Sequence, residues 1–310
     1  MKSNLHNELE VHNLPYMGLK HPIGGRLAII KDESFEDLIQ TINSEGIEAI
    51  SLNCARGWMR EDVSFLSCLS TIKSLSIISS DVENITAIEN MESLEELELT
   101  ATIEESIDFK SLKNLKTCYL HWWKDAANIF KCNWLKELYL DELKIKKTIE
   151  IEGIGSLVSL EKLVISNSNI KSLEWLSNLT QLKELELINC RSVSDFSEIS
   201  SLINLKKLQI EGCSKLRDLN FLKALPDLEW LDLSSNGVLP SIATLAGSKK
   251  LKALFMTGST SIEDGDLSFL VDLPKLAILS FTGKKHYTHK LIKKWSLDDL
   301  NNPDTLLKLK

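Results

Sequence analysis

Leucine and isoleucine recur through this chain in a frame of the form L-x-x-L-x-L, in which apolar and polar positions alternate. The clearest copies begin at Leu160, Leu182, Leu205 and Leu228, as in LKELELINC from Leu182. The alternation has the period of a β-strand, whose successive side chains point to opposite faces. Each copy therefore predicts a short strand with leucines on one face and polar side chains on the other.

The frame recurs in phase over most of the chain, with starts 20 to 25 residues apart. The eleven copies begin at Ile47, Ile72, Leu94, Leu115, Leu135, Leu160, Leu182, Leu205, Leu228, Leu251 and Leu276. Between frames, apolar residues are spaced by threes, as from Ile170 to Leu182, and this period suits 3₁₀ turns. One such unit cannot bury its own leucines, so the repeats are expected to stack around a continuous core.

The repeat resembles the leucine-rich repeats of the bacterial internalin-like subclass, which are about 22 residues long. The resemblance covers roughly residues 47–285. It implies an α/β solenoid, an arc with a parallel β-sheet on its concave face and 3₁₀ or irregular returns on its convex face. It is specific for architecture but weakly specific for function, because the fold hosts many binding roles.

The residue at the ninth position of the repeat differs between the two halves of the chain. The family usually places Asn there, and here only Asn236 matches; Cys190 and Cys213 hold the slot in adjacent repeats, and Ser259 holds it near the end. We therefore expect residues 160–240 to be more regular than the N-terminal half. Both cysteines are expected to be buried thiols, although adjacent strands lie close enough for a disulfide.

The ends of the chain depart from the repeat, and a solenoid needs covers there. Residues 1–46 are predicted to form an N-terminal segment and cap. Within it, 26–46 is typical of a strand followed by a helix, with Ser34 as N-cap, and the Pro- and Gly-bearing part before it is expected to be irregular. The repeats span 47–285, and 286–310 is expected to be a C-terminal cap and tail.

Positions 3, 5, 7 and 8 of each frame are expected to face outward on the concave side. Nine acidic residues fall there, against two strong bases, Lys162 and Lys207. Like charges on neighbouring strands cost stability, so this imbalance suggests a use. Acids interleaved with Tyr and Trp are typical of protein interfaces. The predicted partner-binding residues are Glu96, Glu98, Tyr119, His121, Trp122, Glu137, Tyr139, Asp141, Glu142, Glu184, Glu186, Glu211, Trp230, Asp232 and Phe255. The alternative is a solvated acidic face that keeps the chain soluble.

The stretch NLKTCYLHWWKD, residues 114–125, places two tryptophans at the end of one predicted strand. Trp122 falls in an outward column and is expected to be at least half exposed. Trp123 falls in the inward ninth slot, where it is expected to distort the turn and fill the core near Phe130. In the alternative, both rings pack in the local turn.

Composition narrows the class of partner. The 310 residues carry a net charge of −8, which repels nucleic acid and anionic lipid. The N-terminus does not resemble a secretory signal, and no stretch approaches the roughly 18 apolar residues of a spanning helix. We therefore expect a cytoplasmic protein that contacts neither membrane nor nucleic acid; export without an N-terminal signal is the alternative.

The sequence offers little for catalysis. The cysteines lack zinc-type spacing, and no H-E-x-x-H, G-x-S-x-G or Walker frame occurs. An open sheet does not supply the desolvated pocket that would shift the pKa values of Asp141 and Glu142. His286 and His289, beside Tyr287, are expected to lie in a polar cap turn rather than to bind metal. No catalytic residue, metal or cofactor is predicted.

The function expected from these observations is non-enzymatic binding of a protein with a basic surface. The chain is expected to be a monomer when free. One role that fits is a cytosolic immunity or inhibitor protein, and the alternative is a translocated bacterial effector that binds a host protein. A metal- or carbohydrate-dependent enzyme is a remote alternative.

Overall fold

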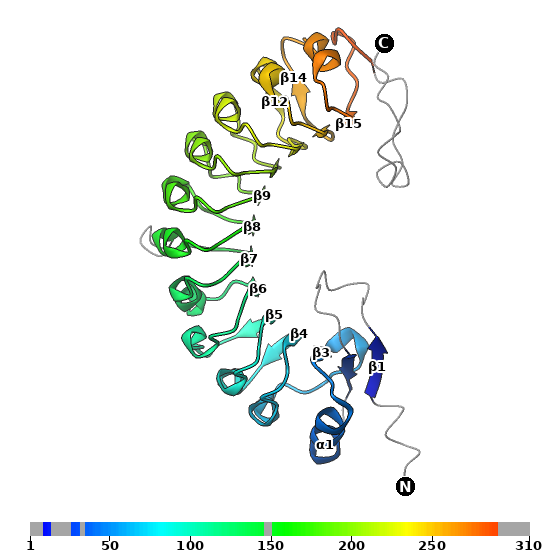
Figure 1. The fold of residues 1–310 in the computed structure, drawn as a ribbon, viewed down its shortest axis with the longest axis vertical. Coiled ribbons are helices and arrows are strands. Elements are labelled where there is room, and N and C mark those ends of the chain that lie inside the picture. The colour runs from blue at the N-terminus through cyan, green and yellow to red at the C-terminus, as the bar shows by residue number, and fades with distance from the viewer. Residues whose placement is uncertain (1–8, 14–25, 32–34, 146–150, 291–310) are drawn as a thin grey trace. The chain divides into compact units, whose positions relative to one another are not determined.

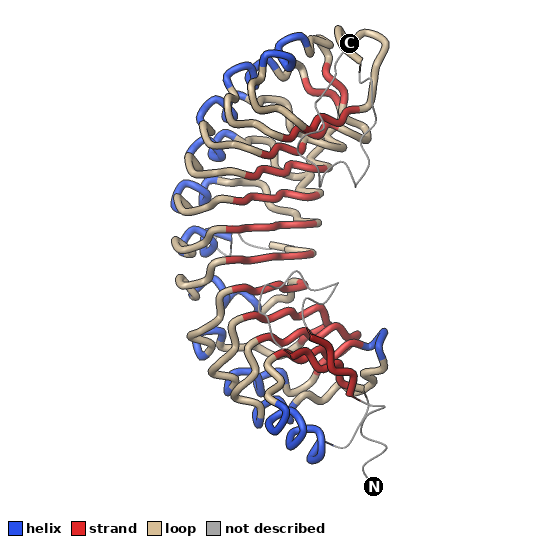
Figure 2. The backbone as a smooth tube through the Cα atoms, turned by 45° about the vertical axis from the view of Figure 1, so that its right-hand side comes forward, coloured by secondary structure: helices blue, strands red, loops and turns tan. Residues whose placement is uncertain are grey.

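The computed structural model describes residues 9–13, 26–31, 35–145 and 151–290. The chain divides into two compact units, Met1–Leu140 and Asp141–Lys310, a division that the sequence did not predict. In each unit, successive repeats place their strands side by side and their helical turns away from the strands (Figure 1, Figure 2). None of the helices in the described ranges is long and apolar enough to cross a bilayer.

The strands of the first unit follow the chain order β1-β2-β3-β4-β5-β6-β7. They are β1 (Leu9–Asn13), β2 (Arg26–Ile30), β3 (Ala49–Asn53), β4 (Ser74–Val82), β5 (Glu96–Ile103), β6 (Thr117–His121) and β7 (Glu137–Asp141). Its 3₁₀ helices are Cys54–Arg56, Ser64–Cys68, Ile85–Asn90, Phe109–Ser111 and Ala126–Lys131. The pairings from β2 to β6 are parallel. The segment before residue 26 was expected to be irregular, but β1 pairs antiparallel with β2.

The helix expected between residues 26 and 46 is α1 (Phe35–Glu45), which follows β2. Leu38 and Ile42, four residues apart, form its buried stripe. Gly46 follows in the left-handed conformation, and the amide of Ile47 donates to the carbonyl of Ile42, a common way to end a helix. The predicted N-cap, Ser34, lies outside the described residues.

The second unit is the more regular one. Its strands are β8 (Lys162–Ser166), β9 (Glu184–Ile188), β10 (Lys207–Glu211), β11 (Trp230–Asp232), β12 (Val238–Leu239), β13 (Ala253–Met256), β14 (Ser261–Ile262) and β15 (Ile278–Phe281). Its 3₁₀ helices are Gly153–Ser156, Glu174–Asn178, Ser197–Ser201, Asn220–Ala224, Ala243–Gly247 and Ser268–Asp272. The main sheet has the order β8-β9-β10-β11-β13-β15, and β12 pairs separately with β14.

The frame leucines of the second unit form the core that the pattern predicts. Leu163, Leu185 and Leu208 are paired in register on adjacent parallel strands. All three are fully buried. Since each repeat adds one such layer, the core is continuous through the unit.

A ladder of polar side chains fills the ninth slot and bonds each repeat to the carbonyl of the repeat before it. The contacts are Cys190 Sγ to Ile165 O at 3.6 Å, Cys213 Sγ to Leu187 O at 3.5 Å, Asn236 Nδ2 to Ile210 O at 2.6 Å and Thr260 Oγ1 to Leu233 O at 2.7 Å. Ser259 was expected to hold the slot in its repeat, but the contact is made by the next residue, Thr260. Cys190 and Cys213 are buried free thiols. A hydrogen bond with Cys213, together with burial, raises the pKa of Cys190.

Position 8 of the repeat was expected to continue the outward face, but in the second unit it is a left-handed turn residue in every repeat except the last, where Gly283 holds it. The residues, with φ between 52° and 65°, are Glu142, Asn167, Asn189, Gly212, Ser235 and Gly258. The period-two alternation ends where the strand ends, and the chain turns at once. In the described part of the first unit, the position-8 residues do not adopt this conformation. The second unit is therefore the more regular, as expected for residues 160–240.

Residues 286–288 pack against the last repeats. Tyr287 is 7% exposed, and its hydroxyl accepts a hydrogen bond from the amide of Ile262. Nε2 of His286 lies 2.8 Å from the carbonyl oxygen of Ile262. These two side chains thus meet both polar backbone groups of the last residue of β14.

Candidate functional site

The outward side chains of the second unit are arranged in columns by strand register. Glu184 lies opposite Lys162 on one side and Lys207 on the other. In the next column, Asp232 lies opposite Gln209 and Phe255. Residues far apart in sequence therefore share one rigid face, at the positions that the alternation predicts.

Lysines neutralise part of the acidic charge on this face, so it is less one-sided than the residue count suggests. Lys162 Nζ lies 2.9 Å from Glu184 Oε2, and Lys207 Nζ lies 2.6 Å from Glu186 Oε1. Lys162 and Glu184 are in register on adjacent strands, whereas Lys207 and Glu186 are diagonal neighbours on adjacent strands. Opposite charges on neighbouring strands stabilise a sheet, so Glu184 and Glu186 have a structural role in the free protein.

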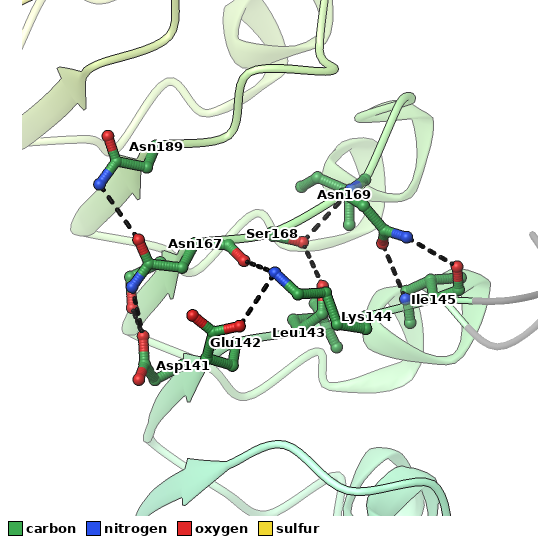
Figure 3. Close-up of polar contacts among 11 residues, drawn as sticks. Asp141, Glu142, Leu143, Lys144, Ile145, Asn167, Ser168, Asn169 and Asn189 are labelled. Carbon is green, nitrogen blue, oxygen red and sulfur yellow. Dashed lines mark hydrogen bonds and ion pairs between the residues drawn. The ribbon is translucent and has the colours of Figure 1, made fainter.

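Asp141 and Glu142 also make internal contacts (Figure 3). Asp141 Oδ1 accepts hydrogen bonds from Ser166 Oγ at 2.6 Å and Asn167 Nδ2 at 2.9 Å. Asn189 Nδ2 donates in turn to Asn167 Oδ1 at 3.1 Å. Asp141 thus starts a polar chain that links three successive repeats.

The second acid of this pair, Glu142, forms an ion pair with Lys144, a residue that lies beyond the strand frame and was therefore not considered in the sequence analysis. Lys144 Nζ lies 3.0 Å from Glu142 Oε2 and donates to the carbonyl of Asn167 at 2.6 Å (Figure 3). Glu142 also has the left-handed φ of 56°. Its geometry is that of a turn residue rather than of a projecting strand residue.

An aromatic pair lies on the outward face near the end of the unit. The rings of Trp230 and Phe255 are 5.3 Å apart between centroids and tilted by 41°. Lys207 Nζ lies 4.9 Å from the centroid of the Trp230 ring, a cation–π distance. Trp230 and Phe255 are half-buried, so each keeps surface that a partner can contact.

Two acids beside this pair, Glu211 and Asp232, contact polar groups rather than lysines. Glu211 Oε2 accepts from Gln209 Nε2 at 2.7 Å, and Asp232 Oδ1 accepts from the amide of Ser234 at 2.8 Å. Burial raises the pKa of Asp232 above its usual value of 3.8, and the nearby charge of Glu211 acts in the same direction. The ionised form of Asp232 is therefore destabilised in the free protein.

The first unit carries a second aromatic group on its sheet. The rings of Tyr119 and Tyr139 stack with centroids 6.0 Å apart, and the Tyr139 hydroxyl donates to Glu137 Oε2 at 2.9 Å. His121 is half-buried at the end of the same strand as Tyr119. Glu98, two strands from Tyr139, accepts from Ser76 Oγ at 2.6 Å.

The two adjacent tryptophans both pack locally, as in the alternative stated above, although only Trp123 is buried as expected. Trp122 is half-buried and Trp123 is 9% exposed. Phe130, however, stacks on Trp122 with centroids 5.5 Å apart, whereas Trp123 packs against Phe109 and donates to the carbonyl of Glu105. The expectation that Trp123 fills the space at Phe130 was wrong in its partner, because the turn after β6 directs Trp122 toward the 3₁₀ return.

One predicted surface acid is not on the surface. Glu96 is 4% exposed, and Ser74, its in-register neighbour, is 7% exposed. Ser51 and Ser76 are buried too. This end of the first sheet is closed to solvent, so Glu96 leaves the set of candidate contact residues.

Comparison with known proteins gives matches at the level of fold. A family model described as the leucine-rich-repeat domain of the endo-β-N-acetylglucosaminidase EndoS matches residues 159–250. An internalin (inlF) from Listeria monocytogenes superposes with a TM-score of 0.58 and 19% identity, covering 84% of this chain and 83% of that one. The chain has the leucine-rich-repeat fold.

A second solved structure agrees with this leucine-rich-repeat assignment. A TDR receptor superposes with a TM-score of 0.57 and 20% identity, covering 79% of this chain and 44% of the receptor. The comparison with curated protein sequences found no significant match. At these identities the likeness concerns the architecture, and a leucine-rich-repeat architecture is shared by proteins of many functions.

Sequence reasoning missed an acidic groove of this leucine-rich-repeat chain. It has a volume of about 480 Å³ in the first unit. Its lining residues are Glu61, Asp81, Val82, Glu83, Asn84, Thr102, Glu104 and Glu105. The signal was present, because acids follow two neighbouring strands directly, but the alternating frame directs attention away from strand ends. Among the described residues, no three His, Cys, Asp or Glu side chains are grouped so as to hold a metal ion.

Proposed function

We propose that this leucine-rich-repeat protein is a non-enzymatic scaffold that binds a protein through the outward face of its sheet. The observation that carries the proposal is the exposure of the predicted contact residues. Of fifteen, fourteen are partly exposed, and Glu96 is the exception. Aromatic side chains held on a hydrogen-bonded sheet lose little entropy on binding, which favours them as anchors.

The partner is a protein with a basic surface. The net charge of −8 favours encounter with such a protein, and Glu211 and Asp232 supply acids on the face itself. An inhibitor or immunity role inside the cell, in which the face covers a basic toxin or enzyme, is consistent with these properties. As an inhibitor or as an immunity protein, the scaffold acts by covering a surface of its partner and catalyses no reaction.

The test is affinity purification from source-cell lysate with four forms of the full chain. The wild type is compared with Tyr139→Ala and Phe255→Ala, one for the face of each unit. Ile203→Ala is the matched control, since Ile203 is an apolar side chain that is 57% exposed on a return segment. A partner retained by the wild type and the control, and lost from a face variant that keeps its circular dichroism, supports the proposal. Equal retention by all four forms contradicts it.

A further inference from the structure

The acids of the second unit differ in how far their charge is already compensated. Glu142, Glu184 and Glu186 each contact a lysine of the same unit. Among the residues that the structure describes, Glu211 and Asp232 form no such ion pair. Asp141 is bonded by Ser166 and Asn167 at the other end of the unit, so on β10 and β11 the charge that a partner can still neutralise is that of Glu211 and Asp232.

This remaining charge lies directly beside the aromatic pair. Asp232 and Trp230 are two residues apart on β11, so their side chains emerge on the same face. Phe255 lies opposite Asp232 in the register of β11 and β13. Lys207 lies on the neighbouring strand β10, and its Nζ is already placed over the Trp230 ring. An incoming cation is thus directed toward Glu211 and Asp232, and an apolar side chain toward Phe255.

Asp232 gains most from such a cation. It is half-buried, and burial raises its pKa. The like charge of Glu211 acts in the same direction, and the hydrogen bonds from Ser234 and the charge of Lys207 offset only part of the effect. A guanidinium can bond two carboxylates at once through its planar fork, whereas an ammonium acts as a compact point charge. Arginine therefore relieves the repulsion between the two acids better than lysine does.

We infer that the surface formed by Glu211, Asp232, Trp230 and Phe255 binds an extended segment of a partner protein that carries an arginine and an apolar side chain two residues apart. This inference rests on the proposed function of the sheet face and specifies its ligand. In an extended segment such side chains share one face and lie about 6.6 Å apart, somewhat more than the roughly 4.8 Å between neighbouring strands. The arginine then meets Glu211 and Asp232 while the apolar side chain covers Phe255 and Trp230.

The experiment pans a phage-displayed library of random linear peptides on the full-length chain. The expected result is enrichment of peptides with Arg and an aromatic or large aliphatic residue at i and i+2. A synthetic peptide of the enriched sequence should then lose affinity by roughly tenfold to a hundredfold when its Arg is replaced by Gln, and by less when it is replaced by Lys.

Three protein variants locate the contact. Asp232→Asn keeps the acceptor for the Ser234 amide and removes only the charge, so it should weaken the peptide without unfolding the chain. Phe255→Ala should weaken it as well. Asp227→Asn is the matched control, because it makes the same charge change in a turn outside the sheet, where Asp227 pairs with Lys250, and it should leave affinity unchanged.

The results separate this inference from the proposed function. Enrichment of peptides without the Arg–apolar pair, or binding lost with Tyr139→Ala but not with Asp232→Asn, overturns the inference and leaves a protein-binding face in place. The inference is also wrong if the library yields nothing while a lysate protein is captured through the face, or if a glycan array gives the ligand instead. Equal capture of lysate proteins by all face variants contradicts the proposed function itself.

Discussion

Asn236 is predicted to contribute more to stability than a surface residue of comparable size, because its side chain bonds two backbone groups of the preceding repeat. Its side chain is fully buried; Oδ1 accepts from the amide of Cys213 at 2.8 Å, and Nδ2 donates to the carbonyl of Ile210 at 2.6 Å. Replacement by alanine leaves both backbone groups buried without these partners. Each orphaned group costs about 1–3 kcal/mol, so we expect Asn236→Ala to lower the free energy of unfolding by about 2–6 kcal/mol. That is a large part of the roughly 5–15 kcal/mol of a typical domain.

The assay is equilibrium unfolding in urea, followed by far-ultraviolet circular dichroism and by tryptophan fluorescence. The free energy is obtained from the midpoint and the m-value. A matched control is Asn204→Ala, since Asn204 is exposed and makes one described bond, from Nδ2 to the carbonyl of Thr180 at 2.9 Å. We expect the control to lose no more than about 1 kcal/mol.

A third variant separates the two bonds of Asn236. Cysteine occupies the same slot in the two preceding repeats, where its thiol donates to a carbonyl. Asn236→Cys should keep a weak donor toward Ile210 and lose the acceptor for Cys213, so its loss of stability should fall between those of alanine and wild type. If Asn236→Ala unfolds at the same urea concentration as Asn204→Ala with an unchanged m-value, the ladder is not a stabilising element.

Three further predictions concern single positions. Gly212→Ala should lower the free energy of unfolding by at least about 1 kcal/mol, since φ is +65° and a Cβ would overlap Oδ1 of Asn189; a thermal melt equal to wild type contradicts this. Asp232→Asn should be at least as stable as wild type at pH 7: the raised folded-state pKa means that wild type gains stability as pH falls toward the unfolded value of 3.8, and urea titrations across that range should show no such gain in the variant. Tyr287→Phe should cost about 1–3 kcal/mol, because the amide of Ile262 loses its acceptor; hydrogen exchange at Ile262 should then increase, and unchanged protection argues against the capping role.

The strand register could be predicted from sequence because a period of two leaves no freedom. Once Leu163, Leu185 and Leu208 are placed in the core, their neighbours must face outward, and the paired strands confirm this. The same rule failed one residue beyond the strand. Position 8 was assigned to the outward face by extending the alternation, whereas the chain there adopts a left-handed turn.

Side-chain pairing across repeats could not be predicted in this way. The partner of Glu142 is Lys144, a residue outside the strand frame, and the count of outward residues did not include it. Burial of Glu96 likewise does not follow from the alternation, which places its side chain on the outward face. Periodicity determines which face a side chain points to. Which partner the side chain reaches, and whether it is buried, depend on its length and on neighbouring segments.

These pairings change what the acidic composition means for recognition. If all nine acids were available, affinity would depend on a diffuse field, which salt screens over roughly 8–10 Å, and many basic proteins would bind alike. In the second unit, lysines instead neutralise Glu142, Glu184 and Glu186, whereas Glu211 and Asp232, beside Trp230 and Phe255, have no lysine partner among the described residues. A partly desolvated pair of carboxylates next to an aromatic surface is sensitive to the geometry of its ligand as well as to its charge. The distribution of lysines along the sheet, more than the number of acids, therefore determines which basic segment this face can select.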